Sequence, residues 1–180
     1  KTPDALARSR ECKPIVATFC RWLRFGAVGP EQLVQSPIVH AALQSLADPE
    51  LYEPASDLIC ELAYVSRDLT TGMPVFQLLT SNLGNFYNLY QSAVQKDDET
   101  GARAIARIVS EMGESYCDVL SQASADAVQM VQLLVQVASH PEARIACLTY
   151  SFWWRLCSTL KSCDDAARAQ RVQALREPLV

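Results

Sequence analysis

The side chains best suited to recognition chemistry in this sequence are uncharged amides and hydroxyls that recur at helical spacing. They form two groups, with Gln77, Ser81, Asn82, Asn85 and Asn88 in the first and Gln129, Gln132 and Gln136 in the second. Because a primary amide donates and accepts hydrogen bonds without carrying charge, each group suits contact with another protein. Members of a group lie about three or four residues apart, which places them on one side of a helix. A surface that meets only water is the open alternative for both groups.

Arrangements that catalysis or metal binding would require are missing from the sequence. Its two histidines, His40 and His140, lie near no cysteine pair with ligand spacing, and the seven cysteines include no C-x-x-C motif. Neither a phosphate-binding glycine loop nor a serine nucleophile motif occurs. The acidic runs at 97–99 and 164–165 are better explained as helix caps than as ligands of a cation. We therefore expect no enzyme activity, no catalytic residues, no cofactor and no metal.

Composition and charge narrow the class of partner. With 180 residues, of which 49% are hydrophobic, the chain can bury a substantial core. Its net charge of −4 argues against a surface that follows nucleic-acid phosphates, which requires clustered Lys and Arg. No apolar run approaches the roughly 20 residues that a membrane-spanning helix needs. We expect protein partners, with no direct binding of nucleic acid and no insertion into a membrane.

Apolar residues recur with the helical period along nearly the whole chain, which predicts an all-α fold. Glycine and proline separate the first segments, for example at Gly29-Pro30, Ser36-Pro37 and the Gly72-Met73-Pro74 stretch. The predicted helices lie at about 3–25, 37–47, 49–65, 75–96, 99–119, 125–139, 142–162 and 165–175. The two amide groups therefore fall on the predicted helices at 75–96 and 125–139.

The main breaks in this pattern suggest a repeat. They fall at Asp48-Pro49, Asp97-Asp98 and His140-Pro141, about 49 and 43 residues apart, and each interval holds two helices. This spacing is typical of HEAT arrays, in which neighbouring helix pairs complete each other's core. We predict a HEAT-repeat α-solenoid, a right-handed superhelix of antiparallel helix pairs, with about four repeats at 3–47, 48–96, 97–139 and 140–176. An ordinary helical bundle is the alternative architecture.

Three stretches carry a resemblance to a known family. They are residues 20–26 with the following 36–39, residues 48–52 leading to 58–62, and the aromatic-rich residues 146–156. These stretches resemble the central repeats of importin-β superfamily receptors, in particular the transportin-SR and importin-13 group. The resemblance spans roughly residues 9–160 and rests on helix-packing patterns.

The resemblance implies a nuclear transport receptor that shuttles between cytoplasm and nucleus. Such a receptor holds protein cargo, typically splicing factors with Arg/Ser-rich domains, on its concave surface and is regulated by the GTPase Ran in its GTP form. Nucleoporins are further candidate partners. The second helix of each pair would line the concave side, which gives both amide groups a place in cargo contact. The chain would then be a segment of a longer solenoid, and a static HEAT-repeat scaffold without Ran regulation is the alternative.

Overall fold

The computed structural model describes residues 3–26, 28–122 and 125–179, and it contains helices but no strand in these ranges. The all-α prediction is therefore confirmed. The chain forms two compact units, residues 1–108 and 109–180.

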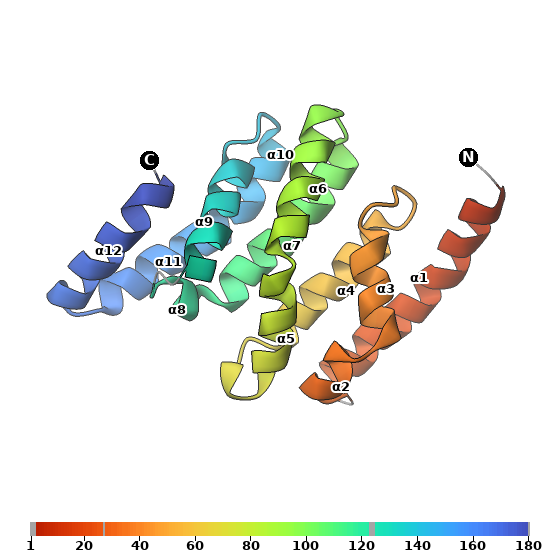
Figure 1. The fold of residues 1–180 in the computed structure, drawn as a ribbon, viewed down its shortest axis with the longest axis horizontal. Coiled ribbons are helices and arrows are strands. Elements are labelled where there is room, and N and C mark those ends of the chain that lie inside the picture. The colour runs from red at the N-terminus through yellow and green to blue at the C-terminus, as the bar shows by residue number, and fades with distance from the viewer. Residues whose placement is uncertain (1–2, 27, 123–124, 180) are drawn as a thin grey trace. The chain divides into compact units, whose positions relative to one another are not determined.

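The first unit consists of two layers of helices (Figure 1). A first layer holds α1 (Pro3–Arg24) and α4 (Tyr52–Val65), which pack against each other. The second layer holds α2 (Pro30–Val34), α3 (Pro37–Ser45), α5 (Leu69–Ser81) and α6 (Leu83–Gln95). Helix α2 packs on α5 within the second layer, and α3 packs on α4 across the two layers.

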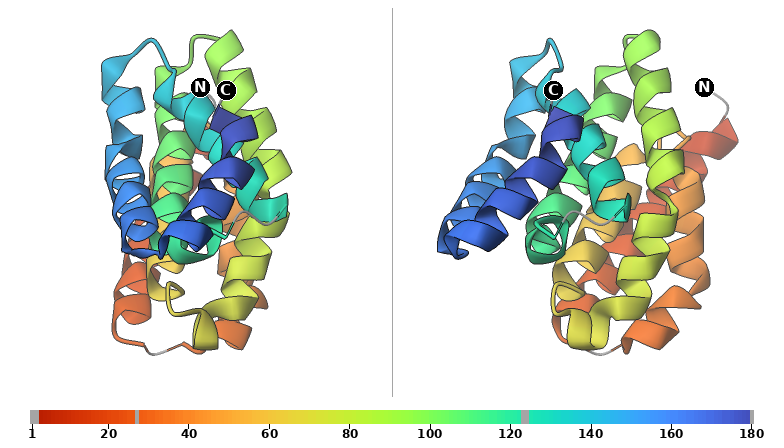
Figure 2. Two further views of the ribbon diagram at one scale, coloured as in Figure 1. Left: turned by 90° about the vertical axis from the view of Figure 1, so that its left-hand side faces the viewer. Right: turned by 60° about the vertical axis from the view of Figure 1, so that its left-hand side comes forward.

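The second unit repeats the two-layer arrangement (Figure 2). Its first layer holds the end of α7 (Glu99–Ser115), the short α8 (Cys117–Leu120) and α11 (Tyr150–Ser162). Its second layer holds α9 (Ala125–Ala138) and α12 (Asp165–Leu179), which pack against each other. The short α10 (Ala143–Ala146) and a 3-10 turn at Cys147–Thr149 lead into α11.

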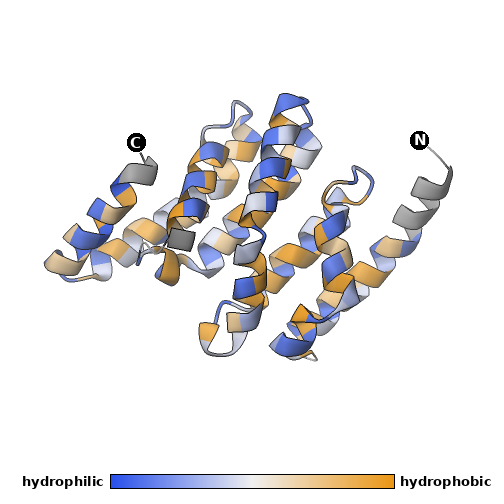
Figure 3. Cartoon of the chain, viewed as in Figure 1, coloured by the Kyte–Doolittle hydropathy of each residue, from blue (hydrophilic) through white to orange (hydrophobic). Residues whose placement is uncertain are grey.

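Packing between the layers buries many of the apolar side chains of the helices. Hydrophobic and hydrophilic residues alternate along α5, α6 and α9, as their helical period requires (Figure 3). The largest fully buried side chains include Leu58, Ile59, Leu62, Leu79 and Phe86 in the first unit, and Met112, Tyr116 and Phe152 in the second. In the first unit these side chains come from both layers, and in the second unit α9 of the second layer adds the buried Met130 and Leu134. Each core is therefore shared between two layers.

The helix predicted at 75–96 is wrong in its boundaries, because two helices occupy this region. Helix α5 already begins at Leu69, where Asp68 accepts a 3.0 Å hydrogen bond from the amide of Thr70 and caps the helix. It then passes through Gly72, which the sequence suggested as a break. A Cβ atom on Gly72 would lie 2.3 Å from the carbonyl oxygen of Ser66, so glycine is needed here for a close approach of two chain segments.

The break between α5 and α6 lies instead at Asn82, whose side-chain amide donates to the carbonyl of Leu78 at 2.8 Å. The helices predicted at 99–119 and 142–162 are interrupted in the same way. Tyr116 separates α7 from α8, and the 3-10 turn at Cys147–Thr149 precedes α11. Such one-residue and one-turn interruptions preserve the apolar period, which is why periodicity alone did not reveal them.

Polar contacts join successive helix pairs of the first unit. The Tyr52 hydroxyl donates to an Asp98 carboxylate oxygen at 2.9 Å, and the other oxygen of Asp98 accepts from the amide of Gly101 at the start of α7. Burial, and then the bond to Asp98, raises the pKa of Tyr52 to about 12. Arg107 donates to Asp57 at 2.7 Å. The Tyr52–Asp98 and Arg107–Asp57 bonds therefore connect α4 to α7 and its start.

Candidate protein-binding surface

The first amide surface consists of Gln77, Ser81, Asn82, Asn85 and Asn88. Gln77 and Ser81 lie on α5, Asn82 lies at the junction, and Asn85 and Asn88 lie on α6. All are exposed except Asn82, which is half-buried. The structure therefore brings the predicted residues together along two consecutive helices instead of one.

Two members of the first amide surface use their polar groups within the chain. Asn82 donates to the carbonyl of Leu78, and the hydroxyl of Ser81 donates to the same carbonyl at 2.8 Å. Within the described ranges, the side chains of Gln77, Asn85 and Asn88 make no hydrogen bond to the rest of the chain. These three amides keep their full hydrogen-bonding capacity for solvent or a partner.

The helices that carry the first amide surface have no ionisable charge. Residues 69–95 contain no Asp, Glu, Lys, Arg or His, whereas the first-layer helix α4 carries Glu53, Asp57 and Glu61. The large hydrophobic side chains that are exposed on α5 and α6 include Met73 at 40% and Tyr87 at 41%. Sequence reasoning missed both. Met73 lies four residues before Gln77, on the same side of α5, and this spacing was the signal available in the sequence.

The second amide surface consists of Gln129, Gln132 and Gln136 on α9. Gln129 and Gln132 are exposed and Gln136 is half-buried. They lie on one side of the helix, as their spacing predicts, opposite buried residues such as Met130 and Leu134. Asp126 is the one ionisable residue in the sequence of α9. The second unit therefore also presents a nearly uncharged amide face.

The first layer of the first unit differs from the amide surfaces, because it contains charged side chains that pair with each other. Arg24 of α1 donates twice to one oxygen of Glu61, at 2.9 and 2.7 Å, although Glu61 is only 8% exposed. Burial, followed by the charges of Glu61 and Asp57, raises the pKa of the nearby Cys20 thiol to about 11. Cys20 is therefore protonated at neutral pH and is a poor nucleophile.

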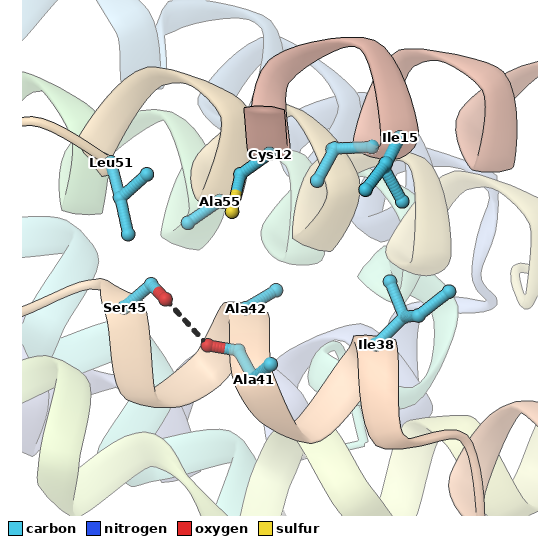
Figure 4. Close-up of a pocket in the computed structure, with 9 residues that line it drawn as sticks. Cys12, Ile15, Ile38, Ala41, Ala42, Ser45, Leu51 and Ala55 are labelled. Carbon is cyan, nitrogen blue, oxygen red and sulfur yellow. Dashed lines mark hydrogen bonds between the residues drawn. The ribbon is translucent and has the colours of Figure 1, made fainter. Parts of the chain in front are cut away.

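An apolar cavity of about 160 Å³ lies between α1, α3 and α4 (Figure 4). The lining residues are Cys12, Ile15, Val16, Ile38, Ala41, Ala42, Ser45, Leu51 and Ala55. The Ser45 hydroxyl donates to the carbonyl of Ala41 at 2.7 Å, as the dashed line shows. Because the Ser45 donor is already used and the other lining side chains are apolar apart from the Cys12 thiol, the cavity offers little to orient a polar substrate.

No group of three or more His, Cys, Asp or Glu side chains among the described residues is arranged to hold a metal ion. No helix in the same ranges is long and apolar enough to cross a membrane. The two amide surfaces stay predicted sites of protein contact.

Both units thus pair amphipathic helices in two layers, which is the fold of helical-repeat solenoid proteins. The profile of the second TPR domain of the Transportin-3/Importin-13 family matches residues 97–180. TPR and HEAT both denote stacked pairs of antiparallel helices. This match and the relatives below make the chain similar to the transportin-like group of the importin-β superfamily.

Two relatives show the extent of the similarity. Transportin MOS14 of Arabidopsis thaliana is 28% identical over 148 residues, and the match covers 79% of this chain and 15% of that protein. An uncharacterized protein of Schizosaccharomyces pombe is 26% identical over 143 residues, with the same coverage of both chains. The chain therefore spans about 15% of the length of these relatives.

Proposed function

We propose that this chain is part of a nuclear transport receptor and that its second-layer helices bind protein cargo. The observation that carries the proposal is the set of exposed amides, Gln77, Asn85 and Asn88, that have no hydrogen-bond partner within the described chain. The similarity to transportins supports the transport role. Gln129, Gln132 and Gln136 are proposed as a second cargo contact.

Cargo release follows from binding of Ran in its GTP form. If Ran-GTP weakens cargo binding by some factor, cargo must weaken Ran-GTP binding by the same factor. The receptor then shuttles between cytoplasm and nucleus, with nucleoporins as further partners during passage. The net charge of −4 favours basic cargo, and splicing factors with Arg/Ser-rich domains are the proposed class.

A pull-down with the full-length receptor tests this function. Immobilised receptor is incubated with an Arg/Ser-rich splicing-factor domain and with Ran locked in the GTP or the GDP state. We expect retention of Ran-GTP over Ran-GDP by at least tenfold, and we expect Ran-GTP to displace the splicing-factor domain. Equal retention of the two nucleotide states would reject the Ran-switched receptor and would leave the static scaffold as the better description.

A further inference from the structure

We propose that the side chain of Asn82 keeps α5 and α6 apart, so that residues 69–95 form two helices where the backbone could form one. The break also positions the first amide surface, because members of this surface lie on both sides of it. The hydrogen bonds at the break belong to this chain alone, and only its effect on cargo rests on the proposed function.

The Leu78 carbonyl is the group whose bonding distinguishes two helices from one. In a continuous α-helix this carbonyl accepts the backbone N–H of the residue four positions later, which is Asn82. Here the backbone N–H of Asn82 donates to the Leu79 carbonyl at 3.1 Å, as in a tightened last turn. The Leu78 carbonyl accepts instead from the side-chain amide of Asn82 and from the Ser81 hydroxyl, each at 2.8 Å. The side chain of Asn82 therefore takes the place of the missing backbone bond.

Packing of the core does not require a break at this position. Buried side chains continue across the break three or four residues apart, namely Val75, Leu79, Leu83, Phe86 and Tyr90. One continuous helix would bury the same stripe. Residues 75–95 contain no proline, and a Cβ on Gly84 would meet no atom within 4 Å. The break is therefore determined by the local bonds around Asn82, and a single substitution should remove it.

The position of the break gives Asn82 a role in the first amide surface. Gln77 and Ser81 precede it, and Asn85 and Asn88 follow it. Residues that follow a helix break are turned relative to those that precede it. Asn82 thus sets the orientation of one half of the surface relative to the other, although its own amide is bonded within the chain. It acts as a positioning residue.

The test of the break is amide hydrogen exchange, measured by NMR on the intact ¹⁵N-labelled chain and on its Asn82→Ala variant. Leu83, Gly84 and Asn85 form the first turn of α6, where backbone N–H groups have no acceptor within their own helix. In one continuous helix these three N–H groups would bond to the carbonyls of residues 79–81. We expect Asn82→Ala to slow their exchange at least tenfold.

Asn88→Ala is the matched control for hydrogen exchange, because it makes the same substitution inside α6. It raises helix propensity equally but leaves the bonds at the Leu78 carbonyl intact. Exchange at residues 83–85 should therefore remain as in the parent chain. Unchanged exchange in Asn82→Ala, or equal slowing in both variants, would overturn the role assigned to the Asn82 side chain.

The positioning role is tested in the full-length receptor with an Arg/Ser-rich splicing-factor domain as the probe. We expect Asn82→Ala to weaken binding at least fivefold at an unchanged melting temperature, because the two halves of the surface no longer face the partner as before. Slowed exchange with unchanged binding would reject the positioning role. A parent receptor that fails to bind the domain would reject the cargo function, whereas hydrogen exchange would still decide whether Asn82 maintains the break.

Discussion

Replacing Phe152 with alanine is expected to lower the free energy of unfolding by about 3–5 kcal/mol, the usual range for a buried aromatic ring. The Phe152 ring is fully buried at the centre of the second unit. It lies edge to face with the Trp153 ring at a centroid distance of 4.7 Å. A Cβ atom on Gly113 would lie only 3.0 Å from the Phe152 ring, so α7 and α11 approach closely there. Removal of the ring would leave a cavity that these two helices cannot close without moving.

Urea denaturation followed by circular dichroism measures the loss, and Trp154→Ala is the matched control. Trp154 is the next residue on the same helix, but it is 73% exposed. Its removal should change the unfolding free energy by no more than about 0.5 kcal/mol. Equal effects of Phe152→Ala and Trp154→Ala would contradict the packing described for the second unit.

Replacing Gly72 with alanine is expected to cost about 1–3 kcal/mol, as overpacking of a tight contact does. The added Cβ would lie 2.3 Å from the Ser66 carbonyl oxygen and 2.7 Å from the Ser66 Cα. Both are backbone atoms, so the clash cannot be relieved by rotating a side chain. The turn between α4 and α5 must therefore open, and the start of α5 must shift.

Gly84→Ala is the control for this prediction, because it makes the same substitution on the next helix. A Cβ on Gly84 would meet no atom within 4 Å. Alanine has the higher helix propensity, so this variant should be neutral or more stable by up to about 1 kcal/mol. Thermal melts of the two variants measure the difference. Only Gly72→Ala is expected to lose stability, and a Gly72→Ala variant as stable as Gly84→Ala would contradict the close approach at Ser66.

The sequence predicted the helical fold well because apolar spacing depends only on which face each helix buries. It failed at Gly72 because glycine usually marks the end of a helix, whereas here it permits a close backbone contact. It also failed at Asn82, whose break depends on a local bond to the Leu78 carbonyl that spacing does not encode. The four repeat boundaries stay a prediction.

For the first amide surface, the sequence predicted which residues are exposed but not which of them form hydrogen bonds within the chain. Spacing correctly placed Gln77, Asn85 and Asn88 on exposed helical faces. Spacing could not show that the side chains of Asn82 and Ser81 donate hydrogen bonds to the Leu78 carbonyl, since these bonds depend on where α5 ends. Cargo contact by these residues stays a proposal.

Hydroxyl-radical footprinting of the full-length receptor tests most directly whether the second-layer helices are the partner surface. Met73 and Tyr87 report on α5 and α6. Trp22 of α1 and Trp154 of α11 each report on the first layer of their own unit. All four side chains are exposed. With an Arg/Ser-rich splicing-factor domain bound, we expect oxidation of Met73 and Tyr87 to fall at least threefold while Trp22 and Trp154 oxidise as before. Protection of Trp22 or Trp154 with unchanged oxidation of Met73 and Tyr87 would contradict the assignment.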